Sequence, residues 1–278
     1  MSAHGTPEPA PGHPDITRIV APNPGPMTLE GTNTYIVGSD PAWVVDPGPA
    51  DEGHIEAVRA EAESRGGIGA VVITHSHLDH NQGASMLGAD VIWGSGGSTD
   101  EGSQLASAAS ELQKSKVVAV RGSFTAEESH AGPFTVLSTP GHANDHVVFV
   151  RGDVIFCGDL ILGEGSSIVP PAVAGGSLAD YLRSLDVVEE VGATLLCPGH
   201  GPWITDPKAK IDEYRAHRLE RERKLLDAYE AGERSRAKLL DAAWGDVPDS
   251  MKPAAALAMQ AHLEKLAGDG LRILELQP

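Results

Sequence analysis

Residues 70–80 read AVVITHSHLDH, and this stretch decides the architecture of the chain. The apolar run from Ala70 to Ile73 is typical of a buried strand, and a segment with four potential metal ligands follows it at once. Four nitrogen and oxygen ligands within six residues suit a borderline divalent metal. The sequence therefore predicts a metal site at the end of this strand, where layered α/β folds commonly build their sites.

Three later segments each place one potential ligand at the end of an apolar strand. TPGH ends at His142, FCGD at Asp159 and CPGH at His200, and each contains a glycine that lets the backbone bend. The candidate ligands are then His75, His77, Asp79, His80, His142, Asp159 and His200. Seven ligands exceed the needs of one tetrahedral ion. They fit two divalent ions that share a hydroxide as nucleophile, with zinc expected first and iron or manganese as alternatives.

Short β-branched runs alternate with helical stretches through the first two thirds of the chain. The expected strands end in Gly, Pro, Asp or His and cover 16–22, 33–39, 42–48, 70–75, 89–94, 116–121, 134–140, 146–152, 153–159 and 194–200. Helices are expected at 51–65, 79–88 and 177–191. Many strands with helices between them indicate sheets covered by helices, which is an α/β layered domain.

The character of the chain changes at Asp206-Pro207. A long charged helix is expected over 208–232, followed by helices at 235–243 and 251–267 and a short strand, LRILEL, at 271–276. Helices followed by a strand suggest a small winged-helix-like unit. We therefore divide the chain into a leader (1–15), a catalytic domain (16–207) and a C-terminal helical domain (208–278).

Composition limits the setting in which the protein works. Two cysteines, Cys157 and Cys197, are too few for a disulfide framework in 278 residues, and we interpret them as reduced and buried, which favours a cytoplasmic location. Residues 1–15 lack the basic start and apolar stretch of a signal peptide, and we expect a disordered leader there. No apolar run approaches the roughly 20 residues that a membrane span needs. The sequence carries no signal for an oligomeric state.

The net charge of −18 falls on the first part of the chain. Residues 1–207 hold 8 Lys/Arg against 26 Asp/Glu, whereas residues 208–278 hold 13 of each. This acidic part disfavours a polyanionic substrate, because RNA binders normally present clustered Lys and Arg. Residues 208–238 are the exception, with ten Lys/Arg against seven Asp/Glu, and a local patch can outweigh distant charge that salt screens over about 8 Å.

The segments that carry the candidate ligands resemble the metallo-β-lactamase superfamily, whose H-x-H-x-D-H signature HSHLDH matches. A narrower similarity to the lactamase-beta-like protein 2 group rests on NPGPMTLEGTNTYIVG (23–38), TPGHANDH (139–146), GDLILGEGSS (158–167), PGHGPWI (198–204) and YRAHRLERE (214–222). The resemblance implies a four-layer αββα sandwich with the metals at one edge between two sheets. It also implies a C-terminal winged-helix-like domain.

The same resemblance divides the ligands between two ions. The first would take His75, His77 and His142, the second Asp79, His80 and His200, and Asp159 would bridge them. Asp79 is also the expected catalytic residue, because it lies on the second ion and can handle a proton. Three further residues are expected beside the ligands or the substrate, namely Asp46, Asn33 and His217. A strand-end turn, an ordinary turn and a solvated helix face are their respective alternatives.

Three functions remain open at this point. The first is hydrolysis of a small acyl substrate, an ester, thioester or lactone. The second is cleavage of single-stranded RNA, which the resemblance implies for at least one branch of the group. The third is a metal- or nucleic-acid-binding module without activity. We favour the first, because the charge repels RNA and because aromatic residues on which bases could stack make up only 4% of the chain.

Overall fold

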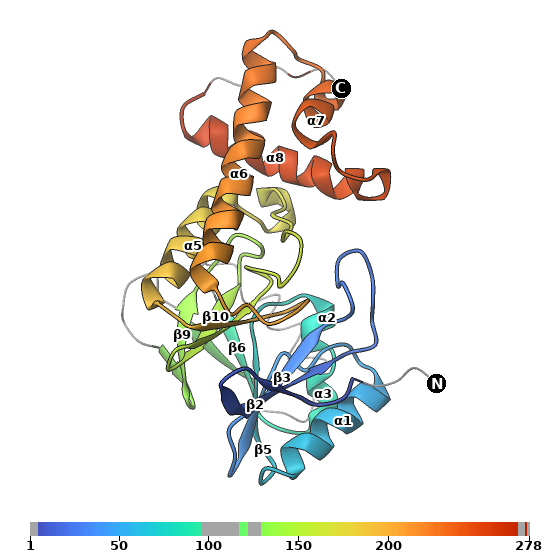
Figure 1. The fold of residues 1–278 in the computed structure, drawn as a ribbon, viewed down its shortest axis with the longest axis vertical. Helices are drawn as coiled ribbons and strands as arrows, with labels where there is room; N and C mark the ends of the chain where they lie inside the picture. Colours follow the sequence, from blue (N-terminus) through green and yellow to red (C-terminus); the bar gives the residue numbers. More distant parts are fainter. Residues whose placement is uncertain (1–4, 96–116, 122–128, 272–275, 277–278) are drawn as a thin grey trace.

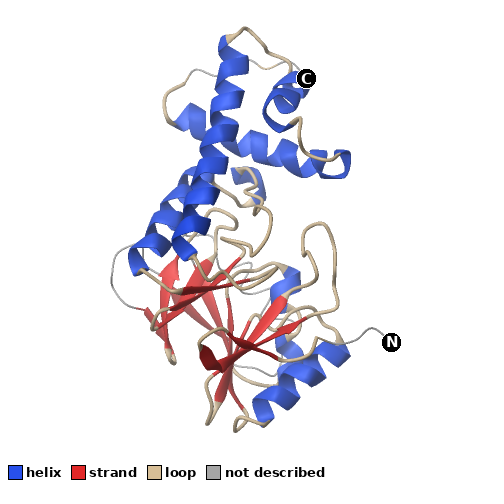
Figure 2. Cartoon of the chain, in the orientation of Figure 1, coloured by secondary structure: helices blue, strands red, loops and turns tan. Residues whose placement is uncertain are grey.

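The computed structural model describes residues 5–95, 117–121, 129–271 and 276. Two β-sheets pack face to face, and helices cover the outer face of each (Figures 1 and 2). The expected αββα sandwich is therefore confirmed, and a group of C-terminal helices extends from it.

The first sheet contains seven strands in the order of the sequence. Their bounds are β1 Glu8–Ala10, β2 His13–Val20, β3 Asn33–Val37, β4 Ala42–Val45, β5 Ile68–Ile73, β6 Val91–Ser95 and β7 Val117–Arg121. Strands β1 to β4 pair antiparallel, and β4 to β7 pair parallel. This arrangement points the end of β5, and the histidine cluster behind it, toward one edge of the sandwich.

The second sheet has the order β12-β11-β10-β9-β8. The bounds are β8 Ser129–Ala131, β9 Phe134–Ser138, β10 Val147–Arg151, β11 Val154–Gly158 and β12 Leu195–Pro198. Strand β10 is antiparallel to both β9 and β11, and β11 is parallel to β12. Strands β9, β11 and β12 therefore run the same way and end at the same edge of the sheet.

Side chains alternate along the strands between two hydrophobic layers. Tyr35 and Phe156 lie in the core between the sheets, where their rings pack at 5.4 Å. Their neighbours on the opposite face, Ile36 and Ile155, pack against the outer helices. Both faces of each sheet are thus buried, which explains why the strands read as continuous apolar runs.

The outer helices carry the N-terminal signals that the sequence offers. Helix α1 (Glu52–Glu63) begins after Asp51, whose side chain accepts a hydrogen bond from the His54 backbone. Helix α5 (Leu178–Val191) begins in the same way after Ser177 and covers the second sheet. A short 3₁₀ helix, η1 (Ala172–Ala174), precedes it.

The N-terminal leader was predicted wrongly. Residues 8–15 are not a disordered leader, because β1 and the start of β2 form a hairpin there. Gly12, with a φ of 76°, closes its turn, so the Pro-Gly pair that suggested disorder is a turn signal. Glu8 further accepts a hydrogen bond from the Trp203 indole at 3.1 Å.

The helix expected over 79–88 is also wrong as a single element. It is divided into α2 (Leu78–Asn81) and α3 (Ala84–Leu87). At Gly83 the chain packs so closely on a neighbouring loop that a Cβ would lie 2.8 Å from the Pro47 carbonyl oxygen. Only glycine permits this close approach, which separates the two short helices.

The C-terminal helices agree with the predicted positions. They are α6 (Pro207–Glu230), α7 (Arg236–Trp244) and α8 (Lys252–Gly268), with a short 3₁₀ helix, η2 (Asp249–Met251), before the last. From Leu225 onward they have a hydrophobic cluster of their own. The first half of α6 instead packs against α5, because Ile211 and Tyr214 belong to the outer cluster of the second sheet. The strand expected at 271–276 lies almost wholly outside the described residues.

Two findings bear on the expected setting of the protein. Cys157 and Cys197 are both buried and free of disulfides, as expected. In the described part of the chain, no helix has the length and apolarity that a membrane crossing requires.

Candidate metal centre

All seven predicted ligands meet at one edge of the sandwich. Their donor atoms form two groups, within each of which they lie no more than 4.8 Å apart. The first group contains His75, His77, His142 and Asp159, and the second contains Asp79, His80 and His200. Each strand-end ligand arrives where its strand stops, after β5, β9, β11 or β12.

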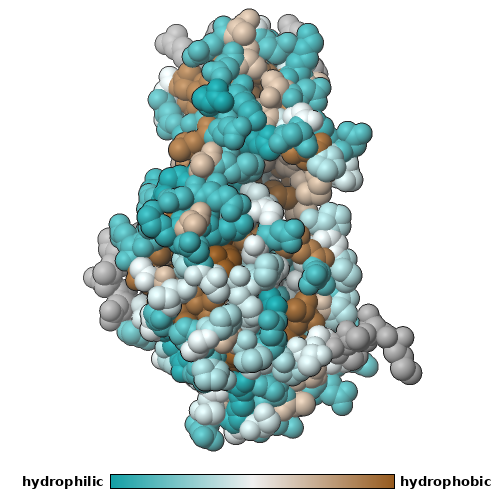
Figure 3. Space-filling view, viewed as in Figure 1, coloured by the Kyte–Doolittle hydropathy of each residue, from teal (hydrophilic) through white to brown (hydrophobic). Residues whose placement is uncertain are grey.

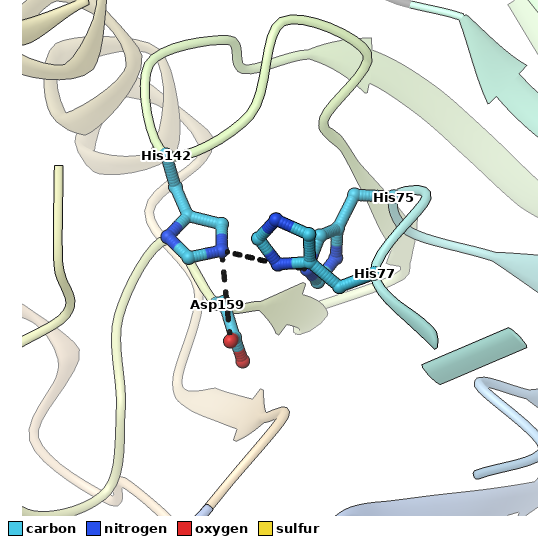
Figure 4. Close-up of side chains that lie close together, drawn as sticks. All are labelled: His75, His77, His142 and Asp159. Carbon is cyan, nitrogen blue, oxygen red and sulfur yellow. Dashed lines mark hydrogen bonds and ion pairs between the residues drawn. The ribbon is translucent and has the colours of Figure 1, made fainter. Parts of the chain in front are cut away.

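In the first group three ring nitrogens converge. His77 Nδ1 lies 2.9 Å from His75 Nε2 and 3.0 Å from His142 Nε2. Asp159 Oδ2 lies 3.7 Å from His142 Nε2 (Figure 4). Ligands about 2.0–2.1 Å from a tetrahedral ion lie about 3.3 Å from one another. The spacing of these donor atoms therefore fits one ion among them.

In the second group the donor atoms have a similar spacing. Asp79 Oδ2 lies 3.5 Å from His80 Nε2 and 3.3 Å from His200 Nε2. The other oxygen of Asp159, Oδ1, lies 3.4 Å from each of the same two nitrogens. Asp159 therefore directs one oxygen toward each group, which is the geometry of a bridging carboxylate.

The outward nitrogen of four ligand histidines is held by an acceptor. His142 Nδ1 lies 2.8 Å from the Ile168 carbonyl oxygen, and His200 Nδ1 lies 3.1 Å from the Gly31 carbonyl oxygen. A carbonyl can only accept, so both Nδ1 atoms carry the proton. Nε2 is then the ring atom that faces the centre and can bind a metal in its deprotonated form.

Asp46 orients the other two histidines. Its Oδ2 lies 2.9 Å from His80 Nδ1 and accepts a hydrogen bond from Thr74 Oγ1 at 2.8 Å. Thr74 Oγ1 in turn lies 3.0 Å from His75 Nδ1. The Asp46 carboxylate thus sets one histidine of each group, directly for His80 and through Thr74 for His75. It also accepts from the Thr74 backbone and has a left-handed φ of 49°.

Two buried atoms at the centre of the site lack any hydrogen-bond partner among the described residues. They are His80 Nε2 and Asp159 Oδ1. Leaving such atoms unsatisfied costs free energy. A divalent ion takes both nitrogen and carboxylate donors and would satisfy them, so the residues present fit a metal.

The two groups differ in charge state. Burial lowers the pKa of the His75 ring, and it lowers that of His142 to about 4, so both rings are neutral. Burial acts in the same direction on His80 and His200, but the Asp159 carboxylate opposes it. The pKa of His80 is held well above its usual value, and that of His200 is raised to about 9. The second group therefore holds protons that a metal must displace.

Asn33 fastens the loop that carries His200. Its side chain donates to the carbonyl oxygens of Pro198 and Gly201, both at 2.9 Å, and its backbone N–H donates to the Gly199 carbonyl at 2.8 Å. Asn33 thus holds the loop that carries His200, and these three hydrogen bonds do not reach the donor atoms themselves. The same segment carries a residue that the sequence did not suggest, Thr32, whose Oγ1 lies 3.4 Å from Asp79 Oδ2.

His217 lies on α6, one layer behind the ligands. It is half-buried, with its Nδ1 3.3 Å from Ser166 Oγ and its Nε2 3.2 Å from Arg221 Nε. Burial and the neighbouring Arg218 and Arg221 lower the pKa of the ring to about 4. It does not line the cavity described below.

The loop after β11 contributes contacts that sequence reasoning missed. Ser167 Oγ lies 3.2 Å from His142 Nδ1 and donates to the Asp159 carbonyl at 2.5 Å. The Ser167 carbonyl accepts a hydrogen bond from the buried Arg218 of α6. A path of contacts thus leads from the C-terminal helix to two metal ligands. The quoted motifs around Ser167 and Arg218 were its only trace in the sequence.

A cavity of about 390 Å³ opens directly on the first group, with His142 and Asp159 in its wall. This volume is in the range of small-molecule sites, about 300–1,000 Å³. Other parts of the wall come from the loop before β3 and from the turn after α7.

Comparisons with known proteins cover almost the whole chain. The family model described as the metallo-beta-lactamase superfamily matches residues 27–200. The Beta-lactamase-like protein 2 homolog of Drosophila melanogaster is 31% identical over 268 residues, 92% of this chain and 88% of the relative. An Atrochrysone carboxyl ACP thioesterase of Aspergillus chevalieri is 34% identical over 285 residues, 95% of this chain and 84% of the relative.

A solved structure extends the likeness of the fold to the C-terminal helices. A metallo-beta-lactamase family protein from Thermus thermophilus superposes with a TM-score of 0.70 at 22% sequence identity. The match covers 94% of this chain and 95% of the other.

Proposed function

Since the chain belongs to the metallo-beta-lactamase superfamily and is a hydrolase, we propose that it cleaves small acyl substrates, namely esters, thioesters or lactones. The reaction would use two divalent ions, with zinc the first candidate, held by the seven converging ligands. The observation that carries this proposal is the position of Asp159, whose two oxygens face two separate groups of donors.

Two divalent ions bound there would lower the pKa of water toward neutrality and polarise the carbonyl of a substrate. The chain's own residues prepare this site in advance. Asp46, Ile168 and Gly31 accept hydrogen bonds from the Nδ1 atoms of their histidines, so each Nε2 already faces inward. A site held in this way need not reorganise as charge develops on the substrate.

We assign to Asp79 the role of accepting a proton during the reaction. Its side chain is 29% exposed, against 11% for Asp159, so it is the more solvent-accessible of the two carboxylates. Burial raises the pKa of the Asp79 carboxyl, but the hydrogen bond with His200 and the nearby His80 together lower it by more than burial raises it. The net pKa lies below the usual value, and the ionised Oδ2 can accept a proton.

The acyl substrate is supported by the fate of the basic residues on α6. Arg215 pairs with Asp186 and Glu189, both at 2.8 Å, and Arg221 pairs with Asp246 at 2.6 Å. Arg223 pairs with Asp227 and Lys224 with Glu220, and the buried Arg218 donates to the Ser167 carbonyl. A patch that is already paired offers little to a phosphate backbone, so the charge of −18 keeps its weight against RNA.

The names of the relatives point the same way, since one similar over 95% of this chain is called an ACP thioesterase. A metal- or nucleic-acid-binding module without activity does not agree with membership of the superfamily, because the chain is a hydrolase. We also propose that the chain divides at Pro207 by role. Residues 16–207 hold the metals, and residues 208–278 face the substrate.

A substrate panel tests this proposal. Zinc-loaded protein is offered acyl esters, N-acetylcysteamine thioesters and lactones beside a labelled single-stranded RNA at matched salt. We expect hydrolysis of at least one acyl class, lost in Asp79→Ala, and negligible RNA cleavage. RNA cleavage that is lost in Asp79→Ala and weakens steeply with salt, beside negligible acyl hydrolysis, would replace the acyl substrate by RNA.

A further inference from the structure

We infer that the cavity of about 390 Å³ beside the first ligand group binds an uncharged, apolar acyl chain and rejects one that ends in a carboxylate. This inference rests on the proposed function and names its substrate class. Three segments far apart in the sequence build the walls, namely residues 26–29, 162–168 and 247–251. Figure 1 shows the loop before β3 extending toward the C-terminal helices, and Figure 3 shows hydrophobic surface at the waist between the two parts.

Most of the side chains in the wall are apolar. The side chains that matter are Met27, Leu29, Leu162, Ile168, Val247 and Met251. Among the described residues that line the cavity there is no lysine and no arginine. Apart from the ligands Asp159 and His142, the charged side chain in the lining is Glu164. A carboxylate that entered would lose water without gaining a cation from the wall, and it would meet the negative charge of Glu164.

The walls hold their shape through contacts of their own. In the first loop, the Thr28 hydroxyl donates to the Asn23 carbonyl at 2.6 Å, and the Gly25 N–H donates to the Leu29 carbonyl at 3.0 Å. The turn after α7 is held by Arg221, which donates two hydrogen bonds to the Asp246 carboxylate, at 2.6 and 2.9 Å. A preformed cavity selects its occupant by shape and polarity.

The rim adds an observation that points to an apolar occupant. Met27 lines the cavity yet leaves 51% of its side chain exposed. Beside the ligand Asp79, Leu78 is 62% exposed. Met27 thus extends the apolar wall of the cavity to the surface of the protein, whereas Leu78 is not part of the lining. The scissile carbonyl would therefore lie at the donor atoms, with the chain running between residues 26–29 and 247–251.

The test uses a series of thioesters on N-acetylcysteamine, a thiol without charge, so that only the acyl group varies. For the wild-type holoenzyme we expect kcat/KM to rise about 3-fold with each CH₂ from acetyl to octanoyl, as burial of methylenes predicts. The 8-carbon thioester that ends in a carboxylate should be at least about 30-fold poorer than octanoyl. Glu164→Gln should reduce this difference in kcat/KM between the octanoyl thioester and the carboxylate-ended thioester several-fold.

A matched pair of variants locates the chain. Met27→Asp should lower the ratio of octanoyl to acetyl turnover about 10-fold, because it places a charge on the wall. Val173→Asp makes a similar change at a side chain that is 93% exposed and outside the cavity, and it should leave the ratio unchanged. Calorimetry with octanamide and with 8-amino-8-oxooctanoic acid, the same amide with a terminal carboxylate, measures binding without turnover. Octanamide should bind more tightly.

The outcomes separate the two proposals. Equal turnover of acetyl and octanoyl thioesters, lost in Asp79→Ala, would overturn the cavity assignment and leave the acyl hydrolase standing. Binding of octanamide that weakens in Met27→Asp, without hydrolysis of any thioester, would leave the cavity assignment and overturn the proposed reaction. Tighter binding of 8-amino-8-oxooctanoic acid than of octanamide would overturn the cavity assignment outright.

Discussion

Asp159 Oδ1 lies 3.4 Å from His80 Nε2, and neither buried atom has a hydrogen-bond partner within the described part of the chain. A folded chain rarely leaves two such atoms facing each other unsatisfied. A divalent ion held by both atoms would satisfy them, and the other oxygen of Asp159 faces the first group. The site is thus organised around one shared carboxylate.

Replacing Asp79 should separate activity from folding. Asp79→Ala removes the partly exposed carboxylate of the second group, so we expect kcat to fall at least about 100-fold. The circular dichroism spectrum should be unchanged, because the side chain is only partly buried. The exposed Asp90 provides the matched control, since Asp90→Ala should keep wild-type turnover. Wild-type kcat in Asp79→Ala would remove this residue from the mechanism.

Removing the Thr74 hydroxyl should weaken metal binding without touching a ligand. Thr74→Val keeps the shape of the side chain but breaks the contact between Asp46 and His75. Loss of such an outer partner typically costs 10–100-fold in metal affinity. Competition with a zinc chelator measures it, and Thr194→Val, at an exposed threonine, should show wild-type affinity. An unchanged zinc affinity would show that Thr74 does not orient His75.

Arg218 links the C-terminal helix to His142 through Ser167, whose carbonyl accepts from Arg218 and whose Oγ lies 3.2 Å from His142 Nδ1. Lysine cannot reproduce the planar geometry of a guanidinium, so Arg218→Lys should lower kcat about 10-fold while KM changes less. Arg223→Lys, at an arginine whose side chain is 65% exposed, is the control. A loss of kcat that merely follows a lower Tm would assign Arg218 to stability alone.

The C-terminal cluster should lose stability in mild acid through His262. Burial, with the nearby Arg218 and Lys265, lowers the pKa of this ring to about 3. The unfolded ring has its ordinary pKa of about 6.5, so the unfolded state binds the proton first as the pH falls. The contribution is therefore complete above pH 6.5 and decreases below it, by about 2 kcal/mol at pH 5.0.

Denaturant unfolding at pH 7.5 and pH 5.0 checks this sign. His262→Gln removes the titrating group, so the difference in unfolding free energy between the two pH values should shrink by about 2 kcal/mol. His130→Gln, at an exposed histidine, should leave the difference as it is in the wild type. The same acid sensitivity in His262→Gln and in the wild type would place its origin elsewhere.

The convergence of the candidate metal ligands was predictable because the segments that carry them follow short apolar strands. That local pattern places His142, Asp159 and His200 at strand ends, and parallel strand directions then bring them to one edge. Features that depend on contacts between distant segments were not predictable. The break at Gly83 arises from packing against Pro47, and the link from Arg218 to Ser167 joins residues 51 positions apart.

The cavity illustrates the same limit. Met27 and Met251 lie at opposite ends of the sequence, and nothing local to either residue indicates that they share a wall. The N-terminal hairpin was not predicted for a different reason. A Pro-Gly pair is compatible with a tight turn as well as with a disordered leader. Only the pairing of β1 with β2 distinguishes the two.

Metal content tests the account most directly. Protein prepared with ample zinc should contain two ions per chain by elemental analysis, and Asp79→Ala, which removes a ligand of the second group, should retain close to one. Iron or manganese in place of zinc would keep the account, because the same donors accept all three. A reproducible content of zero in protein whose circular dichroism shows an intact fold would contradict it.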